Sequence, residues 1–296
     1  MPSEEPTFVD EKLRFLKGDE AARALASTSD EPYLTEQGVV QVPRSRWLLA
    51  QEYERRTWTT AGAHADDDRN LDHRDHFDGY RPLAGLKFER AIELGCGPFT
   101  NLRLIAAVCR IGECTLLDPL IEDYLHHRHC RFTRRRLRTG ETALGKLLGR
   151  NLGGRALRRL LRSVFPQAVE RGIAVTELLA VPIEEMPERD PFDLVVMINV
   201  IEHCYDAPAI FSRLLRMTRP GSIFVFHDKW FDREDVASEI RHHFDAGHPL
   251  RVSGAMIESF LKEHFDPLLN RTARVADELD GIDLSHTGVY FIGRRR

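Results

Sequence analysis

From residue 87 onward, short apolar runs alternate with stretches of helical periodicity, and this alternation constrains the fold more than any other feature. Helical periods occupy residues 101–109, 206–218 and 253–265, and Ser253 is a suitable N-cap for the last of them. Alternating β and α units favour a parallel sheet, because each helix returns the chain to the same end of the sheet. We therefore expect an α/β fold with a doubly wound, mostly parallel sheet, whose strands lie at residues 88–94, 113–118, 173–180, 192–199, 222–227 and 287–293.

The first 86 residues lack this alternation. The chain has 296 residues, which is compatible with one large domain or two small ones. The stretch "RSRWLLAQEYERRTW" (44–58) predicts an amphipathic helix, whereas residues 61–82 are too charged for a core and are interpreted as a loop or a short helix. We expect residues 1–86 to form an N-terminal helical extension or cap, and residues 87–296 to form the main α/β domain.

A basic segment, at about residues 123–172, interrupts the alternation between the second and third strands. Residues 126–171 contain thirteen Lys or Arg and two Glu, a net charge of +11, whereas the whole chain carries −4. Leucines recur at helical spacing on both sides of Gly153-Gly154, which predicts two short amphipathic helices with arginines on their outer sides. We interpret the segment as a lid or a homodimer contact. Binding of nucleic-acid phosphates is the alternative, although few aromatic residues accompany the arginines.

Composition argues against membrane and secreted proteins. No apolar run approaches the ~18–20 residues that a membrane-spanning helix needs. The N-terminus is polar and acidic, without the basic start and apolar stretch of a secretory signal. The five cysteines follow no disulfide or metal-binding pattern. We therefore expect reduced thiols, a cytoplasmic location and no membrane partner.

The segment "AIELGCGPFTNL" (91–102) places two glycines directly after a predicted strand. Such glycines let the backbone approach a ligand closely, and the next helix offers unpaired N–H groups. Thr100 stands where a dinucleotide fingerprint has its third glycine, and Asp118 follows Gly97 by 21 residues, where a carboxylate would bind ribose. This spacing fits a structural bend, a nicotinamide dinucleotide or an adenosyl cofactor. Glu93 favours the last, because a carboxylate would repel a pyrophosphate and attract a cationic amine and sulfonium.

With these motifs the chain resembles the class I S-adenosylmethionine-dependent methyltransferases. "IELGCG" matches their acid-x-Gly-x-Gly turn, "FDLVVMINVIEH" their fourth strand, "RMTRPGSIFVF" the turn before their fifth strand and "AVPIEEMP" the segment that flanks the adenine. The resemblance covers about residues 87–230 and, loosely, the C-terminal strands, but neither residues 1–86 nor the basic segment. It implies a Rossmann-like fold with a seven-stranded sheet, S-adenosyl-L-methionine as the cofactor and methyl transfer as the reaction.

The resemblance also implies roles for individual residues. Glu93 is expected near the methionine amine, Asp118 at the ribose hydroxyls and Asn199 near the sulfonium. Two features depart from the family: Phe99 replaces its usual third glycine, and residues 180–182 (Ala-Val-Pro) occupy the region where a carboxylate often follows the third strand. The other expected contacts are the backbone of Gly95, Cys96 and Gly97 with the methionine part, and Ile183 and Glu184 with the adenine.

Candidate catalytic residues follow the fourth and fifth predicted strands, because ligands of a doubly wound sheet bind beyond the carboxyl ends of its strands. His203 and His227 are candidate bases, since imidazole titrates near working pH. Asp228 could orient an imidazole or act as the base itself. In some family members that methylate sugars or small hydroxylated molecules, a histidine after the fourth strand is the base, and His203 is in a similar place. The alternative is that Glu202 and His203 only cap the helix that follows.

The segment "RHHFDAGHPLRV" (241–252) holds a further group of His and Asp residues. Such a group could bind a divalent metal, but its spacing matches no diagnostic ligand motif, so we predict no metal site. We expect instead a solvated loop that helps to form the substrate pocket.

Together these features predict a cytoplasmic S-adenosylmethionine-dependent methyltransferase of the EC 2.1.1 class. Its expected acceptor is an O or N atom of a small, anionic or sugar-like molecule. A methyltransferase that acts on RNA or protein through the basic segment is the alternative. A non-catalytic, cofactor-binding partner of another enzyme is a third hypothesis.

Overall fold

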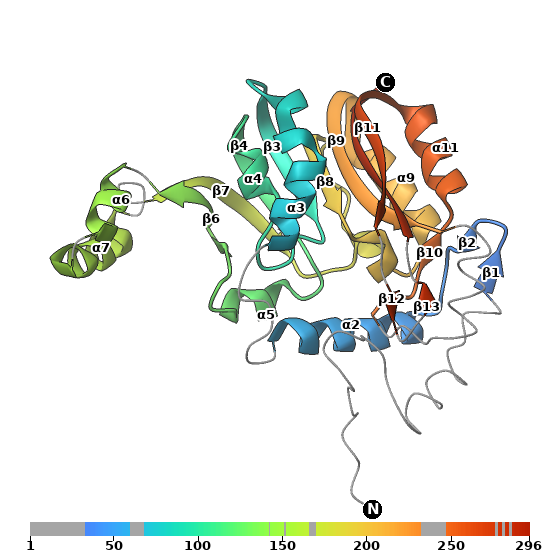
Figure 1. Cartoon of the computed structure of the whole chain (residues 1–296), viewed down its shortest axis with the longest axis horizontal. Coiled ribbons are helices and arrows are strands. Elements are labelled where there is room, and N and C mark those ends of the chain that lie inside the picture. Colours follow the sequence, from blue (N-terminus) through green and yellow to red (C-terminus); the bar gives the residue numbers. More distant parts are fainter. Residues whose placement is uncertain are drawn as a thin grey trace, which may run out of the picture.

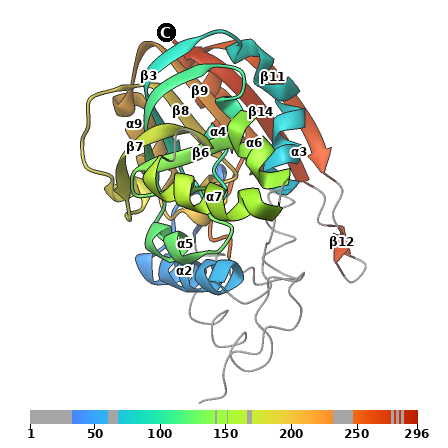
Figure 2. The same cartoon turned by 90° about the vertical axis from the view of Figure 1, so that its left-hand side faces the viewer.

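A computed structural model describes residues 33–59, 68–141, 143–150, 152–165, 170–231, 247–275, 278–279, 282–283 and 286–296. Within these residues one large sheet forms the body of the molecule, and helices lie on both of its faces (Figures 1 and 2). Residues 1–32 and 60–67, and His242, His243 and Asp245 of the predicted His and Asp group, lie outside the described residues. None of the described helices combines the length and the apolar character that crossing a bilayer requires.

The centre of the sheet consists of five parallel strands in the order β7-β4-β3-β8-β9. Along the chain, strands are added first on one side of β3 and then on its other side, so the direction of winding reverses between β3 and β8. This topology confirms the doubly wound fold with a parallel centre. The five strands are β3 (Lys87–Leu94), β4 (Arg110–Leu117), β7 (Glu170–Leu179), β8 (Phe192–Ile198) and β9 (Thr218–Trp230).

Within the described residues the sheet has nine strands, so the expected number of seven is wrong. Antiparallel strands extend both edges: β14 pairs with β9 and β11 with β14 on one side, and β6 pairs with β7 and β5 with β6 on the other. Three of these strands lack a continuous apolar run, because edge strands bury little of their surface. The four strands are β5 (Phe132–Thr133), β6 (Arg136–Glu141), β11 (Phe265–Val275) and β14 (His286–Arg295).

The central strands have the sequence pattern of fully buried parallel strands. Side chains are buried on both faces over residues 91–94 of β3 and 194–198 of β8. A strand covered on both faces is apolar throughout, and this is why both were recognisable in the sequence. Glu93, at the carboxyl end of β3, is the charged exception.

Two hydrophobic clusters lie on opposite faces of the sheet, because alternate residues of β8 belong to different clusters. Helices α9 (Ala207–Met217) and α11 (Gly254–His264) pack in one, and α4 (Leu102–Ile105) and α5 (Ile121–His126) in the other. The N-cap predicted for Ser253 is confirmed, since its hydroxyl accepts a hydrogen bond from the N–H of Met256.

The described part of the N-terminal extension contains α2 (Arg44–Thr59), α3 (Asp68–His76) and the 3-10 helix η2 (Asp78–Leu83). Helix α2 coincides with the predicted amphipathic segment and runs below the sheet in Figure 1. The extension also contains strands: β1 (Leu34–Thr35) and β2 (Gly38–Val39) form a small sheet with β10 (Arg251–Val252). A further two-stranded ribbon consists of β12 (Glu278–Leu279) and β13 (Ile282–Asp283).

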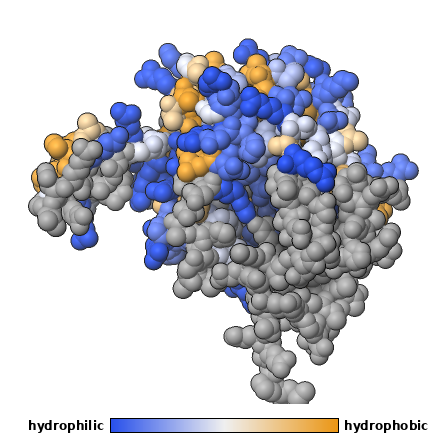
Figure 3. Space-filling model, in the orientation of Figure 1, coloured by the Kyte–Doolittle hydropathy of each residue, from blue (hydrophilic) through white to orange (hydrophobic). Residues whose placement is uncertain are grey.

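Between β6 and β7 the basic segment forms a helical hairpin of α6 (Ala143–Arg150) and α7 (Leu152–Val164). The hairpin projects away from the body of the molecule (Figure 1). Apolar side chains are exposed on it, as the orange atoms on the left of Figure 3 show; they include Leu147, Leu157, Leu160, Val164 and Phe165.

Candidate active site

A cavity of about 1100 Å³, part of it open to solvent, lies at the carboxyl ends of β3 and β8. The winding of the sheet reverses here, which is the usual ligand position in this topology. The turns that follow β3, β4 and β8 line the cavity together with the 3-10 helix η3 (Ile183–Glu185) and residues of α2 and α3.

The turn after β3 is tied to the end of β4. The N–H groups of Gly95 and Cys96 donate to the carbonyl oxygen of Leu117 at 2.8 and 3.1 Å, and the N–H of Gly97 donates to Oδ2 of Asp118 at 3.1 Å. Gly95 adopts φ +64°, and a Cβ there would lie 2.5 Å from Cγ2 of Val200. All three residues of the turn line the cavity, as predicted for a cofactor turn, but their N–H groups already bond to β4 and Asp118.

Glu93 turns back into this loop and is not among the residues that line the cavity. Its Oε1 accepts hydrogen bonds from the N–H of Asn101 (2.6 Å), and its Oε2 accepts from the N–H of Leu102 (3.0 Å) and the hydroxyl of Thr100. Burial raises the pKa of Glu93 to about 6. The N–H groups at the start of α4, which have no partner within the helix, hold the carboxylate in this structure, and its contact with a cationic amine stays a prediction.

Asp118, at the end of β4, lines the cavity with a buried carboxyl group. Besides the N–H of Gly97, it accepts a hydrogen bond from the N–H of Leu120 at 2.9 Å. Desolvation raises its pKa to about 6 in spite of these two donors. The side chain is thus fixed at the cavity wall in a position where further hydroxyl donors can reach it.

The other predicted cofactor residues also lie in the cavity wall. Ile183 and Glu184 belong to η3, and Oε1 of Glu184 accepts the N–H of Tyr205 at 2.7 Å. Asn199 follows β8 with φ +59°, a conformation that is uncommon for non-glycine residues and that occurs often at functional sites. Its N–H donates to the carbonyl oxygen of His227 at 2.7 Å, which ties the ends of β8 and β9 together.

Helix α2 supplies a wall that the sequence analysis did not assign. Trp47, Gln51, Glu54 and Trp58 line the cavity. Their spacing of four, three and four residues places them on one face of the helix, and this polar and aromatic face was the signal that could have revealed them. Nε1 of Trp58 donates to Oε2 of Glu54 at 3.1 Å, which orients the carboxylate.

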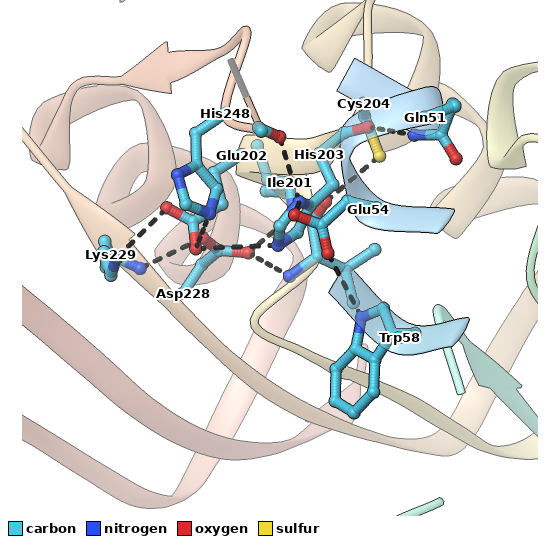
Figure 4. A network of polar contacts seen from close by, with 12 residues as sticks. Gln51, Glu54, Trp58, Ile201, Glu202, His203, Cys204, Asp228, Lys229 and His248 are labelled. Atoms are coloured by element: carbon cyan, nitrogen blue, oxygen red, sulfur yellow. Dashed lines mark hydrogen bonds and ion pairs between the residues drawn. The ribbon is translucent and has the colours of Figure 1, made fainter. Parts of the chain in front are cut away.

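His203 lies where α2 meets the turn after β8 (Figure 4). Its carbonyl oxygen accepts hydrogen bonds from Nε1 of Trp47 (3.1 Å) and Nε2 of Gln51 (3.2 Å). Its imidazole lines the cavity, with Nδ1 3.1 Å from the carbonyl oxygen of Gly247 and 3.8 Å from Oε1 of Glu54. The residue also ends the 3-10 helix η4 (Ile201–His203), while the N-cap of α9 is Asp206.

The other two predicted catalytic residues lie behind the cavity wall. The imidazole of His227 is buried, bonds through Nδ1 to the carbonyl oxygen of Val289 and stacks on Tyr290 at 4.0 Å. Oδ2 of Asp228 accepts the N–H groups of Val200 and Ile201, at 2.9 and 2.6 Å. Neither residue lines the cavity, and their contact with an acceptor stays a prediction. His227 and Asp228 are successive residues of β9, so their side chains point to opposite faces of the sheet. The cavity lies instead at the ends of the strands.

Helix α3 covers the cavity with Arg69, Asn70 and His73. Burial lowers the pKa of His73 to about 2, so this imidazole is neutral at working pH. Its ring lies 4.5 Å from that of His227, which links the cavity wall to the core behind it.

Comparisons with known proteins bear on this site. A family model described as "Methyltransferase domain" matches residues 69–270. No curated protein matches the chain. One similar solved structure is the N-methyltransferase NodS from Bradyrhizobium japonicum WM9 in complex with S-adenosyl-L-homocysteine, with 15% identity, coverage of 83% of this chain and 98% of that chain, and a TM-score of 0.49.

Two further solved structures resemble the chain at similar levels. One is the Burkholderia thailandensis 1,6-didemethyltoxoflavin-N1-methyltransferase, with 14% identity, coverage of 98% of this chain and 99% of that chain, and a TM-score of 0.43. The other is a SAM-dependent methyltransferase from Leishmania major, with 15% identity, coverage of 88% of each chain and a TM-score of 0.45.

Proposed function

The chain belongs to the methyltransferase domain family and is a class I methyltransferase that uses S-adenosyl-L-methionine, and we propose that it methylates an oxygen or nitrogen atom of a small acceptor bound between α2 and the turn after β8. The observation that carries this proposal is the lining of the cavity. It combines the residues expected for the cofactor with the polar and aromatic face of α2 and with residues of α3. A concave site of this kind suits a small molecule better than a strand of RNA or a protein surface.

In this proposal Asp118 accepts hydrogen bonds from the ribose hydroxyls. The residues present fit that role, because the carboxyl group is buried at the cavity wall and is already fixed by two N–H donors. Ile183 and Glu184 flank the adenine, Asn199 lies near the sulfonium, and the turn from Gly95 to Gly97 shapes the methionine subsite. The bound cofactor supplies an electrophilic methyl group.

The acceptor occupies the space beside Glu54 and His203. Both residues contribute polar groups to the cavity wall, and Trp47 and Trp58 contribute aromatic surface to it. Methyl transfer is an in-line displacement, so the main task of this wall is to align the nucleophile and to prepare it by removing its proton.

Incubation with S-adenosyl-L-methionine carrying a labelled methyl group and a cell extract tests the proposal. The extract is separated into low-mass, RNA and protein fractions after the reaction. We expect label in the low-mass fraction, and label in RNA or protein would replace this proposal by the macromolecular alternative. His203→Ala should abolish transfer, while calorimetry shows that binding of S-adenosylhomocysteine is retained. Tight binding of that ligand without transfer to any fraction would indicate a non-catalytic partner.

A further inference from the structure

We propose that Glu54, Glu202, His203 and His248 bind one divalent transition-metal ion at the acceptor end of the cavity. One ligand atom each from Glu54, His203 and His248 lies within 4.8 Å of the other two. Oε1 of Glu202 lies 3.6 Å from Nε2 of His248 and 3.8 Å from Nε2 of His203. Figure 4 shows Glu54 from α2 and His248 from the segment before β10 near Glu202 and His203, which are neighbours in η4. The proposal rests on the proposed function only for the position of the acceptor, and it departs from the sequence-based expectation of no metal.

The distances are close to those of a coordination sphere. With bonds of ~2.0–2.2 Å to nitrogen and oxygen, ligand atoms around a tetrahedral ion lie ~3.4 Å apart. Oε1 of Glu202 lies 3.6 Å from Nε2 of His248 and 3.8 Å from Nε2 of His203, so both imidazoles offer Nε2 beside this oxygen. Nδ1 of His203 faces the carbonyl oxygen of Gly247, and Oε1 of Glu54 lies 3.8 Å from this second ring nitrogen. Glu54 therefore has to rotate toward Nε2 of His203 to reach the same ion.

The four side chains are well shielded and held by their neighbours. Their exposed fractions are 14% for Glu54, 3% for Glu202, 20% for His203 and 6% for His248. Trp58 orients Glu54, and Trp47 and Gln51 hold the main chain of His203. Such neighbours fix the ligands of metal sites before the ion binds.

The local charge favours a cation. Two carboxylates, Glu54 and Glu202, flank the ring of His203. Nζ of Lys229 lies 3.4 Å from Oε2 of Glu202. The imidazoles of His203 and His248 lie near the other oxygen of this carboxylate, Oε1. Two carboxylates that are largely buried would attract a divalent ion to this position.

The ligand types define the class of metal and of acceptor. Two imidazoles with carboxylates suit manganese, iron, cobalt or zinc, whereas magnesium and calcium prefer oxygen ligands alone. An ion that expands from four to six ligands would keep two positions for an acceptor, on the side of the cavity that Glu54 and His203 line. An acceptor with two neighbouring oxygen atoms, such as a vicinal diol or a hydroxy acid, would bind there as a chelate.

In the proposed step, an acceptor hydroxyl bound at this site loses its proton to water, because a divalent cation lowers the pKa of a bound hydroxyl. A lone pair of that oxygen then forms the bond to the methyl carbon. The bond from this carbon to sulfur breaks, and its electron pair stays on sulfur. His203 is in this view a metal ligand, and the reaction needs no separate base.

Titration of the chelator-treated protein with Co(II), followed by calorimetry and by the visible absorption of the ion, tests the site. We expect one equivalent to bind with a spectrum typical of nitrogen and oxygen ligands. Glu54→Gln and His248→Ala should each weaken binding by about 10-fold to 100-fold. His126→Ala, which removes an exposed histidine elsewhere, should leave it unchanged. Retained binding of S-adenosylhomocysteine would show that the variants are folded.

Several outcomes would overturn the inference. Failure to bind a stoichiometric ion would exclude the site, and a Kd unchanged in both variants would move the ion to other side chains. The titration needs no acceptor, so a bound ion without methyl transfer would leave the site standing and contradict the proposed function. Equal rates of methyl transfer with and without the ion would show that the ion has no part in the reaction, while the proposed function would stand.

Discussion

At the scale of single residues, charged groups that the sequence placed in one site divide into two kinds. Asp118 lines the cavity, whereas Glu93 organises the turn beside it and Asp228 holds the loop after β8. Burial raises the pKa of Glu93 and Asp118 to about 6 and that of Asp228 to about 7. Whether each of these carboxyl groups holds a loop or faces the cavity depends on which backbone N–H groups lie near it in the folded chain. The linear sequence does not contain that information.

We predict that the affinity for S-adenosylhomocysteine rises with pH between pH 5 and pH 7. Asp118 must be ionised to accept two ribose hydroxyls, and its raised pKa leaves it protonated below about pH 6 in the free protein. Binding then releases one proton, so the affinity increases by up to about 10-fold per pH unit below this pKa and is constant above pH 7. Calorimetry in two buffers of different ionisation enthalpy measures both quantities. Asp118→Asn should bind weakly at every pH, and a wild-type Kd independent of pH would contradict the assigned role.

Gly95 and Gly97 provide a matched pair for a second prediction. Both have positive φ, but a Cβ on Gly95 would meet Val200 at 2.5 Å, whereas a Cβ on Gly97 would have no heavy atom within 4 Å. We expect Gly97→Ala to cost about 1–2 kcal/mol of unfolding free energy from backbone strain alone. Gly95→Ala should cost about 1–3 kcal/mol more, because the loop after β8 must shift. Urea unfolding compares the two variants, and equal losses would be inconsistent with the contact.

At the scale of elements, α2 contributes most to the part of the site that sequence reasoning did not assign. Its exposed face carries Glu52 and Arg55, which pair with each other, while its opposite face reaches the carbonyl oxygen of His203. The amphipathic pattern predicted that the helix would pack against something. It did not indicate that a ligand cavity lies under part of the packed face.

The two hydrogen bonds to the carbonyl oxygen of His203 lead to a prediction of non-additivity. Trp47→Phe and Gln51→Leu each remove one donor and leave the other, so each should cost about 1 kcal/mol of unfolding free energy. The double variant leaves the carbonyl group without either donor, and we expect it to cost about 1 kcal/mol more than the sum. Arg55→Ala, on the exposed face, serves as the control and should be nearly neutral. Additive losses would show that the two bonds are independent.

At the scale of the whole molecule, the body and the hairpin of α6 and α7 are connected through one antiparallel ladder. β6 and β7 carry the hairpin, and Glu141 lies opposite Glu170 at its base. The two chain ends are therefore adjacent, and a two-residue turn could join them. The body contains the cavity, and no residue of the hairpin lines it among the described residues.

We predict that replacing residues 142–169 by Asn-Gly leaves the fold and cofactor binding intact. The Kd for S-adenosylhomocysteine should stay within about twofold, because the excised residues are remote from the cavity, and calorimetry measures it. The same deletion should reduce retention on heparin, since it removes much of the +11 segment. An unfolded deletion variant would show that the hairpin is part of the folding unit. Loss of methyl transfer with cofactor binding retained would instead support the macromolecular alternative.

The sequence by itself determined the doubly wound centre of the fold, the turn after β3, and Asp118, Asn199 and His203 as residues of one site. Strands buried on both faces must be apolar throughout, and parallel strands bring their carboxyl ends to a common edge, so both features appear as local patterns. Three of the four antiparallel strands, β5, β6 and β11, have no continuous apolar run, whereas β14 has one and was predicted.

Only the tertiary structure decided which of these residues face the cavity. Glu93, His227 and Asp228 lie near the ends of their strands, as residues that line the cavity do. In the structure, Glu93 points into the turn after β3, His227 into the core and Asp228 toward the loop after β8. Glu54 precedes residues 87–230 in the sequence, and His248 follows them. These two residues meet His203 only because α2 and the segment before β10 pack at the same strand ends. Side-chain direction and long-range packing depend on contacts across the whole chain, and for that reason local spacing could not predict them.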